Sequence, residues 1–338
     1  MRKKKILLTG ASGTIGKQVL IKLFLLNKKY ELTILLRPSR KNKRQFKSLE
    51  NFVNIIWGDI QNYKDVEKAV FNKDIIIHVA GVLPDIAISE PDKAKLTNID
   101  GTRNVLDAMK NQENNPKIIF TSSAVVYSKN LENSIIKVSD KLETNPKDVY
   151  TYTKIKAENL IRISGLDYCI FRIPYVVSVD ILKFRPIMFH IALDAPIEII
   201  HVKDVAQAII NAMESNEVWN KIFNLGGGSD CQTSYRENLN NFFDIVGLGK
   251  NFLPEATFTK DSIYYGIFDS QETANLQKLL NFQQYTLEDF YIEVKKWIGI
   301  KRFLIPLIRP FLRWYILRKS EIYKKNKNES NTKSGVIK

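Results

Sequence analysis

Two tyrosine–lysine pairs with the same spacing lie in one short stretch, YTYTKIKAE at residues 150–158. Tyr150 precedes Lys154 by four residues, and Tyr152 precedes Lys156 by the same interval. Side chains four residues apart lie on one side of a helix, about one turn from each other. A phenol beside an ammonium group can exchange a proton with a substrate oxygen, because the cation favours the phenolate. The stretch therefore indicates acid–base chemistry by one of the two pairs.

A glycine-rich turn near the start of the chain has the composition of a phosphate-binding loop. The segment TGASGTIG follows a short apolar run and precedes a helical pattern. Glycines let the backbone approach a pyrophosphate, and the amide groups at a helix N-terminus favour its charge. The spacing is G-x-x-G-x-x-G rather than the G-x-G-x-x-G of the usual dinucleotide fingerprint. We predict a dinucleotide-binding loop formed by Gly10, Ser12, Gly13, Thr14, Ile15 and Gly16.

The second apolar run ends in LLRPSR, with arginines where many dinucleotide folds carry an acid. An acid near this point binds the ribose 2′-hydroxyl of NAD, whereas an arginine accommodates the 2′-phosphate of NADP. Arg37 and Arg40 therefore favour NADP(H) over NAD(H), with Ser12 as a second contact. The alternative is that both arginines belong only to a basic surface run over residues 37–44.

Short apolar runs alternate with stretches of helical period through the first half of the chain. The runs are continuous rather than alternating, which indicates burial on both faces and a parallel sheet covered by helices. We predict an α/β fold with a doubly wound parallel sheet of Rossmann type. The expected strands are residues 5–9, 32–36, 53–57, 74–80, 117–123 and 168–172, and the expected helices are 15–26, 66–71, 102–109 and 152–163.

The pattern loosens after about residue 174 and then recovers a helix at 204–213, a strand at 221–225 and a helix at 287–297. The tail beyond residue 325 holds too little apolar surface to offset the entropy of ordering. The predicted organisation is a dinucleotide-binding domain (1–173), a small substrate-binding subdomain (174–298) interleaved with returning Rossmann elements (201–225), an amphipathic basic segment (299–325) and a disordered tail (326–338).

Cysteine content and the N-terminal sequence bear on the compartment. Cys169 and Cys231 lie far apart without metal-ligand spacing, so neither a disulfide framework nor a metal site is expected. The start MRKKKILLTGASG is basic like a signal peptide, but its apolar run is too short and ends in glycine. We expect a cytoplasmic protein.

Beyond the glycine loop, further motifs follow one another in a characteristic order: GDI at 58–60, HVAG at 78–81, Asn98 followed by GTRNVLDA at 101–108, FTSSAVVY at 120–127, YTYTKIKAE at 150–158, FRIP at 171–174, HVKDVAQAI at 201–209 and FNLGGG at 223–228. Over roughly residues 5–298 the chain resembles the extended short-chain dehydrogenase/reductase superfamily, and within it the NAD-dependent epimerase/dehydratase family. The resemblance implies that Asp59 and Ile60 lie beside the adenine of the cofactor, and Ala80 and Gly81 along its ribose and phosphates.

The same resemblance implies a catalytic hydroxyl at Ser123 and favours one of the two tyrosine–lysine pairs. In the family the lysine follows a small hydroxyl residue and is followed by Ala and Glu at plus three and plus four, a pattern that Lys154 fits and Lys156 does not. Residues two apart on a helix are rotated by about 200°, so only one pair can face a cleft. We therefore expect Ser123, Tyr150 and Lys154 to be catalytic, with Tyr150 and Lys154 also contacting the cofactor.

The expected chemistry depends on the acidity of Tyr150. A free phenol has a pKa of about 10, and we expect Lys154 and an oxidised nicotinamide to lower it toward neutrality. Tyr150 would then accept a proton from a substrate hydroxyl as hydride leaves the carbinol carbon, or donate it in reverse. Ser123 would orient the same oxygen, and Lys154 would hold the nicotinamide ribose.

Three further polar residues have structural interpretations. Asp204 precedes an apolar periodic run, so we expect it to cap the N-terminus of a helix. His78 and His201 are isolated histidines near strand ends and are expected to be structural.

The family includes 4-epimerases, 4,6-dehydratases and ketoreductases. Dehydratases carry an Asp-Glu pair directly after the catalytic hydroxyl, where this chain has Ala124 and Val125. Only 26 residues separate FRIP from HVKDV, and Tyr175 stands near the place of a familiar asparagine. Three hypotheses stay open: an epimerase or 4-ketoreductase of a sugar nucleotide, an NADP(H)-dependent reductase of a small carbonyl compound, and a redox-idle NADP-binding scaffold.

The C-terminal segment carries most of the chain's positive charge. From Lys301 onward there are eleven basic and two acidic residues, which supplies nine of the fifteen net positive charges. Residues 300–319 are rich in large apolar side chains but are too interrupted by charge and proline to span a bilayer. Arg302, Arg309 and Arg313 fall on one side of a helical wheel, as in helices that lie in the membrane interface. We expect peripheral attachment to an anionic membrane surface at the inner face. Packing on the protein body, or on a second subunit in a homodimer, is the alternative, and nucleic acid is the least favoured partner.

Overall fold

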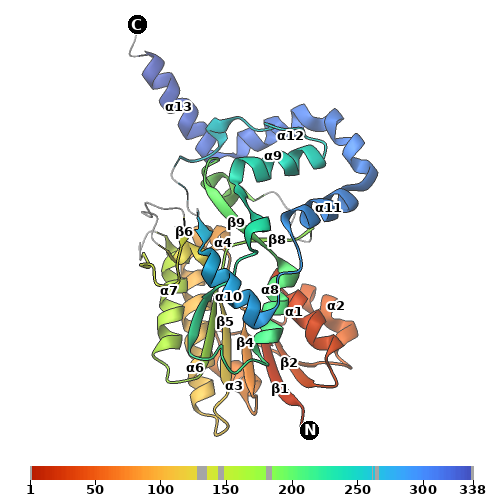
Figure 1. Cartoon of the computed structure of the whole chain (residues 1–338), viewed down its shortest axis with the longest axis vertical. Coiled ribbons are helices and arrows are strands. Elements are labelled where there is room, and N and C mark those ends of the chain that lie inside the picture. Colours follow the sequence, from red (N-terminus) through yellow and green to blue (C-terminus); the bar gives the residue numbers. More distant parts are fainter. Residues whose placement is uncertain are drawn as a thin grey trace.

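The computed structural model describes residues 2–127, 135–143, 148–179, 185–260, 262 and 266–335, with side chains through residue 329. It consists of a large sheet with helices on both faces and a smaller lobe built mainly from the C-terminal half (Figure 1). In Figure 1 the smaller lobe lies at the upper end and the N-terminus at the lower end.

The large sheet has seven strands in the order β10-β7-β5-β4-β1-β2-β3, and every neighbouring pair is parallel. Successive residues of its central strands are buried on opposite faces: Ile6 and Leu8 belong to one core cluster, and Leu7 belongs to another. This explains the continuous apolar runs, and the predicted doubly wound parallel sheet is confirmed. The strands are β1 (Lys4–Thr9), β2 (Tyr30–Leu36), β3 (Asn54–Trp57), β4 (Ile75–His78), β5 (Lys117–Ser123), β7 (Tyr168–Ile173) and β10 (Lys221–Asn224).

Helices cover both faces of this sheet, with α1 and α8 packed together on one face and α3, α6 and α7 on the other. These helices lie close to the ranges predicted from the sequence, whereas the short helix α2 within the basic run was not predicted. The helices around the sheet are α1 (Thr14–Leu25), α2 (Arg40–Phe46), α3 (Tyr63–Val70), α4 (Pro84–Ser89), α5 (Pro91–Lys95), α6 (Gly101–Lys110), α7 (Val149–Arg162), α8 (Val202–Ala212) and α10 (Ser270–Leu280).

The smaller lobe has its own core, rich in aromatic side chains such as Tyr235, Phe243 and Phe252. A three-stranded sheet, β11-β9-β8, and a two-stranded pair, β12-β6, carry this core. The elements are β6 (Ile135–Ile136), β8 (Tyr175–Val177), β9 (Pro196–His201), β11 (Gln232–Ser234), β12 (Ile267–Phe268), α9 (Tyr235–Ile245), α11 (Leu287–Ile298), α12 (Ile305–Lys319) and α13 (Glu321–Gly335).

The structure corrects the prediction that Asp204 caps a helix. Helix α8 begins at Val202, and its N-cap is His201, whose Nδ1 accepts a hydrogen bond from the Lys203 amide at 3.3 Å. Asp204 lies buried in the first turn, where its carboxylate accepts from the Tyr285 amide at 3.1 Å. The sequence pattern did not reveal this, because strand β9 ends at His201 and the helix therefore begins two residues before Asp204.

The C-terminal tail also differs from expectation. Residues 326–335, predicted to be disordered, continue helix α13, while residues 336–338 lie outside the described part of the chain. The Asn326 side chain anchors this helix by donating to the Ala256 carbonyl at 2.9 Å. No helix in the described part of the chain combines the length and apolar character needed to cross a bilayer.

Candidate active site

The predicted site residues follow the carboxyl ends of five neighbouring parallel strands, β1 to β5. Strand β1 pairs with β4 on one side and β2 on the other, so the chain reverses its direction of winding at β1. In open α/β sheets, ligands bind at this reversal, outside the carboxyl ends of the strands. The sheet order therefore brings together segments that are more than 100 residues apart in sequence.

The glycine loop after β1 is closely packed at two of its three glycines. Gly10 has a φ of +76°, and a methyl group there would lie 2.6 Å from the Ala80 amide nitrogen. A methyl group at Gly16 would lie 2.1 Å from the Gly10 carbonyl oxygen. The N-cap of α1, Gly13, offers no side chain to the first amides of the helix, and no acid lies in its first turn. Ser12 and Gly13 are exposed, so these amides are open to an anion, as a pyrophosphate site requires.

Three of the predicted cofactor contacts follow β2 and β3: Arg37 comes after β2, and Asp59 and Ile60 come after β3. Arg37 is exposed, and within the described chain its guanidinium has no hydrogen bond or ion pair. Asp59 accepts a hydrogen bond from the Gln61 amide at 3.0 Å, which fixes the turn after β3. Ile60 is buried against α6, where a methyl group at Gly101 would lie 3.0 Å from its side chain.

Lys154 projects from α7 to the end of β5. Its Nζ donates to the Thr121 carbonyl at 2.9 Å and lies 4.9 Å from the centre of the Phe120 ring. A methyl group at Gly81 would lie 3.5 Å from the same Nζ, so the loop after β4 passes directly beside the ammonium group. Burial lowers the pKa of Lys154 to about 8, and the Glu158 carboxylate partly opposes this shift. The side chain is therefore largely cationic at neutral pH.

Tyr150 lies at the start of α7 against Val82 and Ala87, and its hydroxyl interacts with the Ser123 side chain. Burial raises the pKa of Tyr150 to about 12, while the hydrogen bond with Ser123 lowers it and the nearby Asp148 raises it. The protein groups thus shift this pKa in the direction opposite to the one expected from Lys154. The physical reason is that desolvation of the phenolate dominates, and the Lys154 ammonium interacts with the Thr121 carbonyl instead.

The second tyrosine–lysine pair has a different environment. Lys156 is exposed, and its Nζ lies 5.5 Å from the centre of the Tyr152 ring. Lys154, by contrast, is only 6% exposed and faces the sheet. Only the Tyr150–Lys154 pair therefore points to the strand ends at which the glycine loop lies.

Two buried polar residues, Asn98 and His78, lie at the same edge of the sheet, and neither was predicted to belong to the site. Asn98 Oδ1 accepts from the Val82 amide at 2.9 Å, and its Nδ2 donates to Thr153 Oγ1 at 3.0 Å. This side chain ties the loop after β4 to α7, and its place before GTRNVLDA was the available signal. His78 has its ring nitrogens 2.8 Å from Thr9 Oγ1 and 3.0 Å from Thr102 Oγ1. Burial lowers its pKa to about 3, so the ring is neutral between the two threonine hydroxyls.

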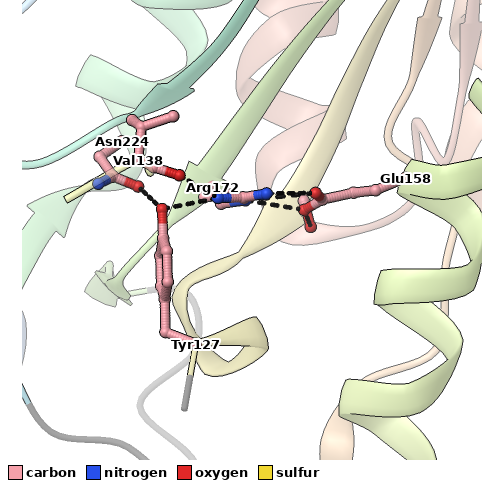
Figure 2. Close-up of polar contacts among 6 residues, drawn as sticks. Tyr127, Val138, Glu158, Arg172 and Asn224 are labelled. Carbon is pink, nitrogen blue, oxygen red and sulfur yellow. Dashed lines mark hydrogen bonds and ion pairs between the residues drawn. The ribbon is translucent and has the colours of Figure 1, made fainter. Parts of the chain in front are cut away.

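A buried ion pair behind the site anchors α7 to the sheet (Figure 2). Arg172 on β7 lies 2.7 Å from the Glu158 carboxylate, one turn beyond Lys154 on α7. The guanidinium also donates to the Tyr127 hydroxyl at 2.9 Å, and that hydroxyl donates to Asn224 Oδ1 at 2.6 Å. No local sequence pattern predicts this network, because its members come from four separate segments of the chain.

Comparison with known proteins agrees with this architecture. Residues 6–226 match the model of the NAD dependent epimerase/dehydratase family. The UDP-glucose 4-epimerase of Rickettsia rickettsii (strain Sheila Smith) is 30% identical over 130 residues, which cover 37% of this chain and 38% of that protein. The CDP-paratose 2-epimerase of Salmonella typhi is 32% identical over 130 residues, covering 36% and 38%. The matched region thus spans less than two fifths of these curated relatives.

Solved structures match over nearly the whole chain at low sequence identity. A short-chain dehydrogenase/reductase superfamily protein from Agrobacterium tumefaciens with bound NAD has a TM-score of 0.68 and 18% identity, covering 91% of this chain and 100% of its own. The UDP-glucuronic acid 4-epimerase of Bacillus cereus, in complex with UDP-glucuronic acid and NAD, has a TM-score of 0.66 and 22% identity, covering 87% and 99%. These likenesses show the fold. The matched family model, which covers residues 6–226, establishes that the chain belongs to the NAD-dependent epimerase/dehydratase family.

Proposed function

We propose that this protein is an NAD(P)-dependent oxidoreductase that transfers hydride at a secondary alcohol or ketone of a sugar nucleotide, as an epimerase or a 4-ketoreductase. The observation that carries the proposal is the buried Lys154, whose Nζ donates to the Thr121 carbonyl beside the loop after β4, with Tyr150 one turn earlier on α7 and interacting with Ser123, at the point where the sheet reverses. Curated relatives named as UDP-glucose and CDP-paratose epimerases support the choice of substrate class.

The residues around the strand ends fit a dinucleotide. The glycine loop leaves no room for side chains at Gly10 and Gly16 and exposes uncapped helix amides, which suits a pyrophosphate. When bound, the nicotinamide supplies the hydride acceptor or donor. The remaining cofactor contacts in this proposal are Asp59 and Ile60 at the adenine, Ala80 and Gly81 along the ribose and phosphates, and Tyr150 and Lys154 at the nicotinamide ribose.

A preference for NADP(H) over NAD(H) rests on Arg37. Its guanidinium is exposed at the end of β2 and has no protein partner within the described chain, so it is available for a 2′-phosphate. Arg40, Lys41 and Arg44 line an open hollow on the following helix and add to the positive potential. The two solved relatives described above both hold NAD, so this preference distinguishes the chain from them.

Proton transfer in this proposal takes place at the Tyr150 hydroxyl. In the oxidative direction the substrate O–H proton passes to the phenolate oxygen as the carbinol hydrogen leaves with its electron pair, and in the reductive direction the phenol returns that proton to the carbonyl oxygen. Ser123 donates a hydrogen bond to the same substrate oxygen. Because burial raises the pKa of Tyr150 to about 12, the protein alone favours the neutral phenol, which is the form that donates a proton during carbonyl reduction.

Elimination of water does not fit the residues that follow Ser123. Ala124 is buried, and neither it nor Val125 carries an acidic or basic group. The site therefore lacks the paired carboxyl groups that dehydratases of this family use at these two positions.

A second candidate is an NADP(H)-dependent reductase of a small carbonyl compound. Only 26 residues separate FRIP at the end of β7 from the His201 N-cap of α8, which leaves little chain for contacts to a nucleotide. Tyr175 on β8 stands near the place where the family pattern has an asparagine. A third candidate, a redox-idle NADP-binding scaffold, differs in predicting tight cofactor binding without turnover.

A single set of assays separates these functions. Purified protein is incubated with each nicotinamide cofactor and either sugar nucleotides (UDP-glucose, UDP-glucuronic acid) or small aldehydes and ketones. An epimerase converts a sugar nucleotide, detected by NMR, without net change in nicotinamide absorbance. A reductase consumes NADPH in proportion to the carbonyl reduced. Cofactor binding by fluorescence with no conversion of any substrate would overturn the enzymatic proposal.

A further inference from the structure

Helix α12, the last but one helix of the chain, has one face docked on the smaller lobe. Its Leu312, Ile316 and Leu317 pack against the aromatic core of that lobe. The 3₁₀ turn that leads into α12 (Gly299–Phe303) also lies against the lobe: a methyl group at Gly247, which follows α9 and has a φ of +89°, would lie only 2.2 Å from the Arg302 carbonyl oxygen. Packing on the protein body, one of the alternatives drawn from the sequence, is therefore observed for this face. The helix has a fixed orientation on the lobe rather than a free one.

The opposite face of the same segment is a continuous stripe of exposed apolar side chains. The Leu307 side chain is 78% exposed and the Phe311 side chain is 62% exposed, so no other segment of the described chain covers them. Within α12, intervals of three or four residues keep the apolar side chains at 307, 308, 311, 314 and 315 on one side of the helix. Ile300, Phe303 and Leu304 extend the stripe along the 3₁₀ turn that leads into α12. We call this set the outer apolar face: Ile300, Phe303, Leu304, Leu307, Ile308, Phe311, Trp314 and Tyr315.

Cations flank the outer apolar face, and no acid interrupts it. Residues 300–319 contain six basic residues and no Asp or Glu. Arg302 and Arg309 are half-buried, and Arg309 lies close to Gly249 of the lobe. These two arginines therefore face the protein rather than the solvent in part. The exposed cations are Lys301, Arg313, Arg318 and Lys319, and none forms an ion pair within the described chain. Arg318 lies 5.3 Å from the ring centre of Trp314, so charge and aromatic surface adjoin.

We propose that the outer apolar face binds the surface of an anionic lipid bilayer. Apolar side chains enter the boundary of the acyl chains, tryptophan and tyrosine occupy the headgroup level, and the cations pair with lipid phosphates. In Figure 1, α12 lies on the smaller lobe, toward the end of the molecule opposite the N-terminus, and α13 extends beyond it. The smaller lobe rather than the large sheet would then lie nearest the membrane. The helix lies on the bilayer without crossing it, in keeping with the two prolines and six charges in residues 300–319.

The positive charge of residues 300–319 favours an anionic bilayer over a second copy of the chain as the partner of the outer apolar face. A symmetric contact between two outer faces would bring Arg313, Arg318 and Lys319 of each copy together with no acid in the segment to offset them. Nucleic acid would satisfy the cations but would leave most of the eight apolar side chains exposed to water. An anionic bilayer satisfies both the charge and the apolar surface.

The test is flotation of the full chain with vesicles of phosphatidylcholine alone or with one third phosphatidylglycerol. We expect flotation only with the anionic vesicles and release by high salt, since cation–headgroup attraction is screened. The pair Leu307→Ser/Phe311→Ser should lose flotation, whereas the control pair Leu25→Ser/Ile163→Ser, at equally exposed apolar positions on the dinucleotide domain, should not. The pair Arg313→Gln/Arg318→Gln should weaken partitioning roughly 30-fold, at about fivefold per cation, and the control Lys68→Gln/Lys110→Gln should have little effect.

Three outcomes would overturn the proposal: equal flotation with neutral and anionic vesicles, no flotation with either, or equal loss in the test and control variants. Light scattering on the same samples identifies the alternative occupant. A dimer that dissociates in the Leu307→Ser/Phe311→Ser variant, without vesicle binding by the parent chain, would assign the face to a second copy. Thermal unfolding of each variant verifies that the fold is intact.

Discussion

Glu158 and Arg172 form an ion pair of 2.7 Å in which the two side chains are 0% and 3% exposed. The pair joins α7 to β7 one turn beyond Lys154, so it fixes the helix that carries both Tyr150 and Lys154 against the sheet. The Glu158 carboxylate also raises the pKa of Lys154 against the effect of burial. The ion pair therefore helps to fix the position of Lys154, and its Glu158 carboxylate helps to keep the Lys154 side chain protonated.

Breaking this pair should destabilise the fold strongly. Glu158→Gln leaves the Arg172 guanidinium buried without its counter-ion, and Arg172→Met leaves the carboxylate in the same condition, each at a cost of about 3 kcal/mol or more. The double variant removes both charges and should lose clearly less than the sum of the single losses. Urea unfolding at pH 7 measures the free energy of unfolding of the parent chain, the two single variants and the double variant. Additive losses would show that the two groups do not interact as the structure indicates.

Substitution of the two tyrosines should separate their roles. Tyr150→Phe removes the proton donor next to Ser123 and should lower kcat by roughly 10² to 10⁴, whereas loss of its contact to the nicotinamide ribose should weaken cofactor binding by no more than about tenfold. Tyr152→Phe is the matched control, since it removes the same atom from the other pair, and should retain kcat within about twofold. Steady-state kinetics and cofactor titration supply both quantities. Equal effects of the two substitutions would refute the assignment.

Arg37 should determine the choice between the two nicotinamide dinucleotides. Arg37→Ala removes a charge-assisted hydrogen bond to a 2′-phosphate and should weaken NADPH binding about 10- to 100-fold, while NADH binding changes little. Lys43→Ala, in the same basic run, tests whether general surface charge is responsible. Fluorescence titration of both cofactors decides the matter. A comparable loss in the two variants, or an equal loss for NADH, would favour the surface-charge explanation.

Stability should fall with rising pH because of Glu198 on β9. Burial raises the pKa of this fully buried carboxyl from 4.5 to about 7, although the amides of Phe268 and Gly228 donate to it and oppose the shift. Between these two values the folded protein binds more protons than the unfolded chain, so the free energy of unfolding decreases as pH rises. The Glu198 contribution is complete below about pH 4.5 and is lost as pH passes 7.

Thermal unfolding at pH 5, 6, 7 and 8 measures this effect. Glu198→Gln should show a shallower decline in Tm over this range than the parent chain, with some decline left because burial also raises the pKa of Asp204 to about 7. Glu50→Gln, at an exposed position, is the control and should follow the parent. Identical slopes for the parent and Glu198→Gln would show that Glu198 titrates at its ordinary pKa in the folded protein.

The parallel sheet and the family were accessible from the sequence because both depend on local patterns. Continuous apolar runs record burial on two faces of a strand, and the order of short motifs from the glycine loop to FNLGGG is a property of the chain alone. The positions of Gly10 and Gly16 likewise followed from local spacing, since a tight strand-to-helix turn needs glycine regardless of the rest of the fold. The choice of Tyr150 with Lys154 rests on helical geometry and stays a prediction until the variants are measured.

Other features depended on segments that meet only after folding. The pKa of Tyr150 rises rather than falls because the depth of burial is set by surrounding elements, and the sequence reveals only the neighbouring cation. The partners of Arg172 and Asn98 come from separate segments, so no local pattern identifies them. For α12, a helical wheel shows an apolar stripe and a group of arginines, but it cannot show which side the smaller lobe covers. Tertiary packing alone decided that Leu312 is turned inward and Phe311 outward, because burial is a property of what lies beside a helix and not of the helix itself.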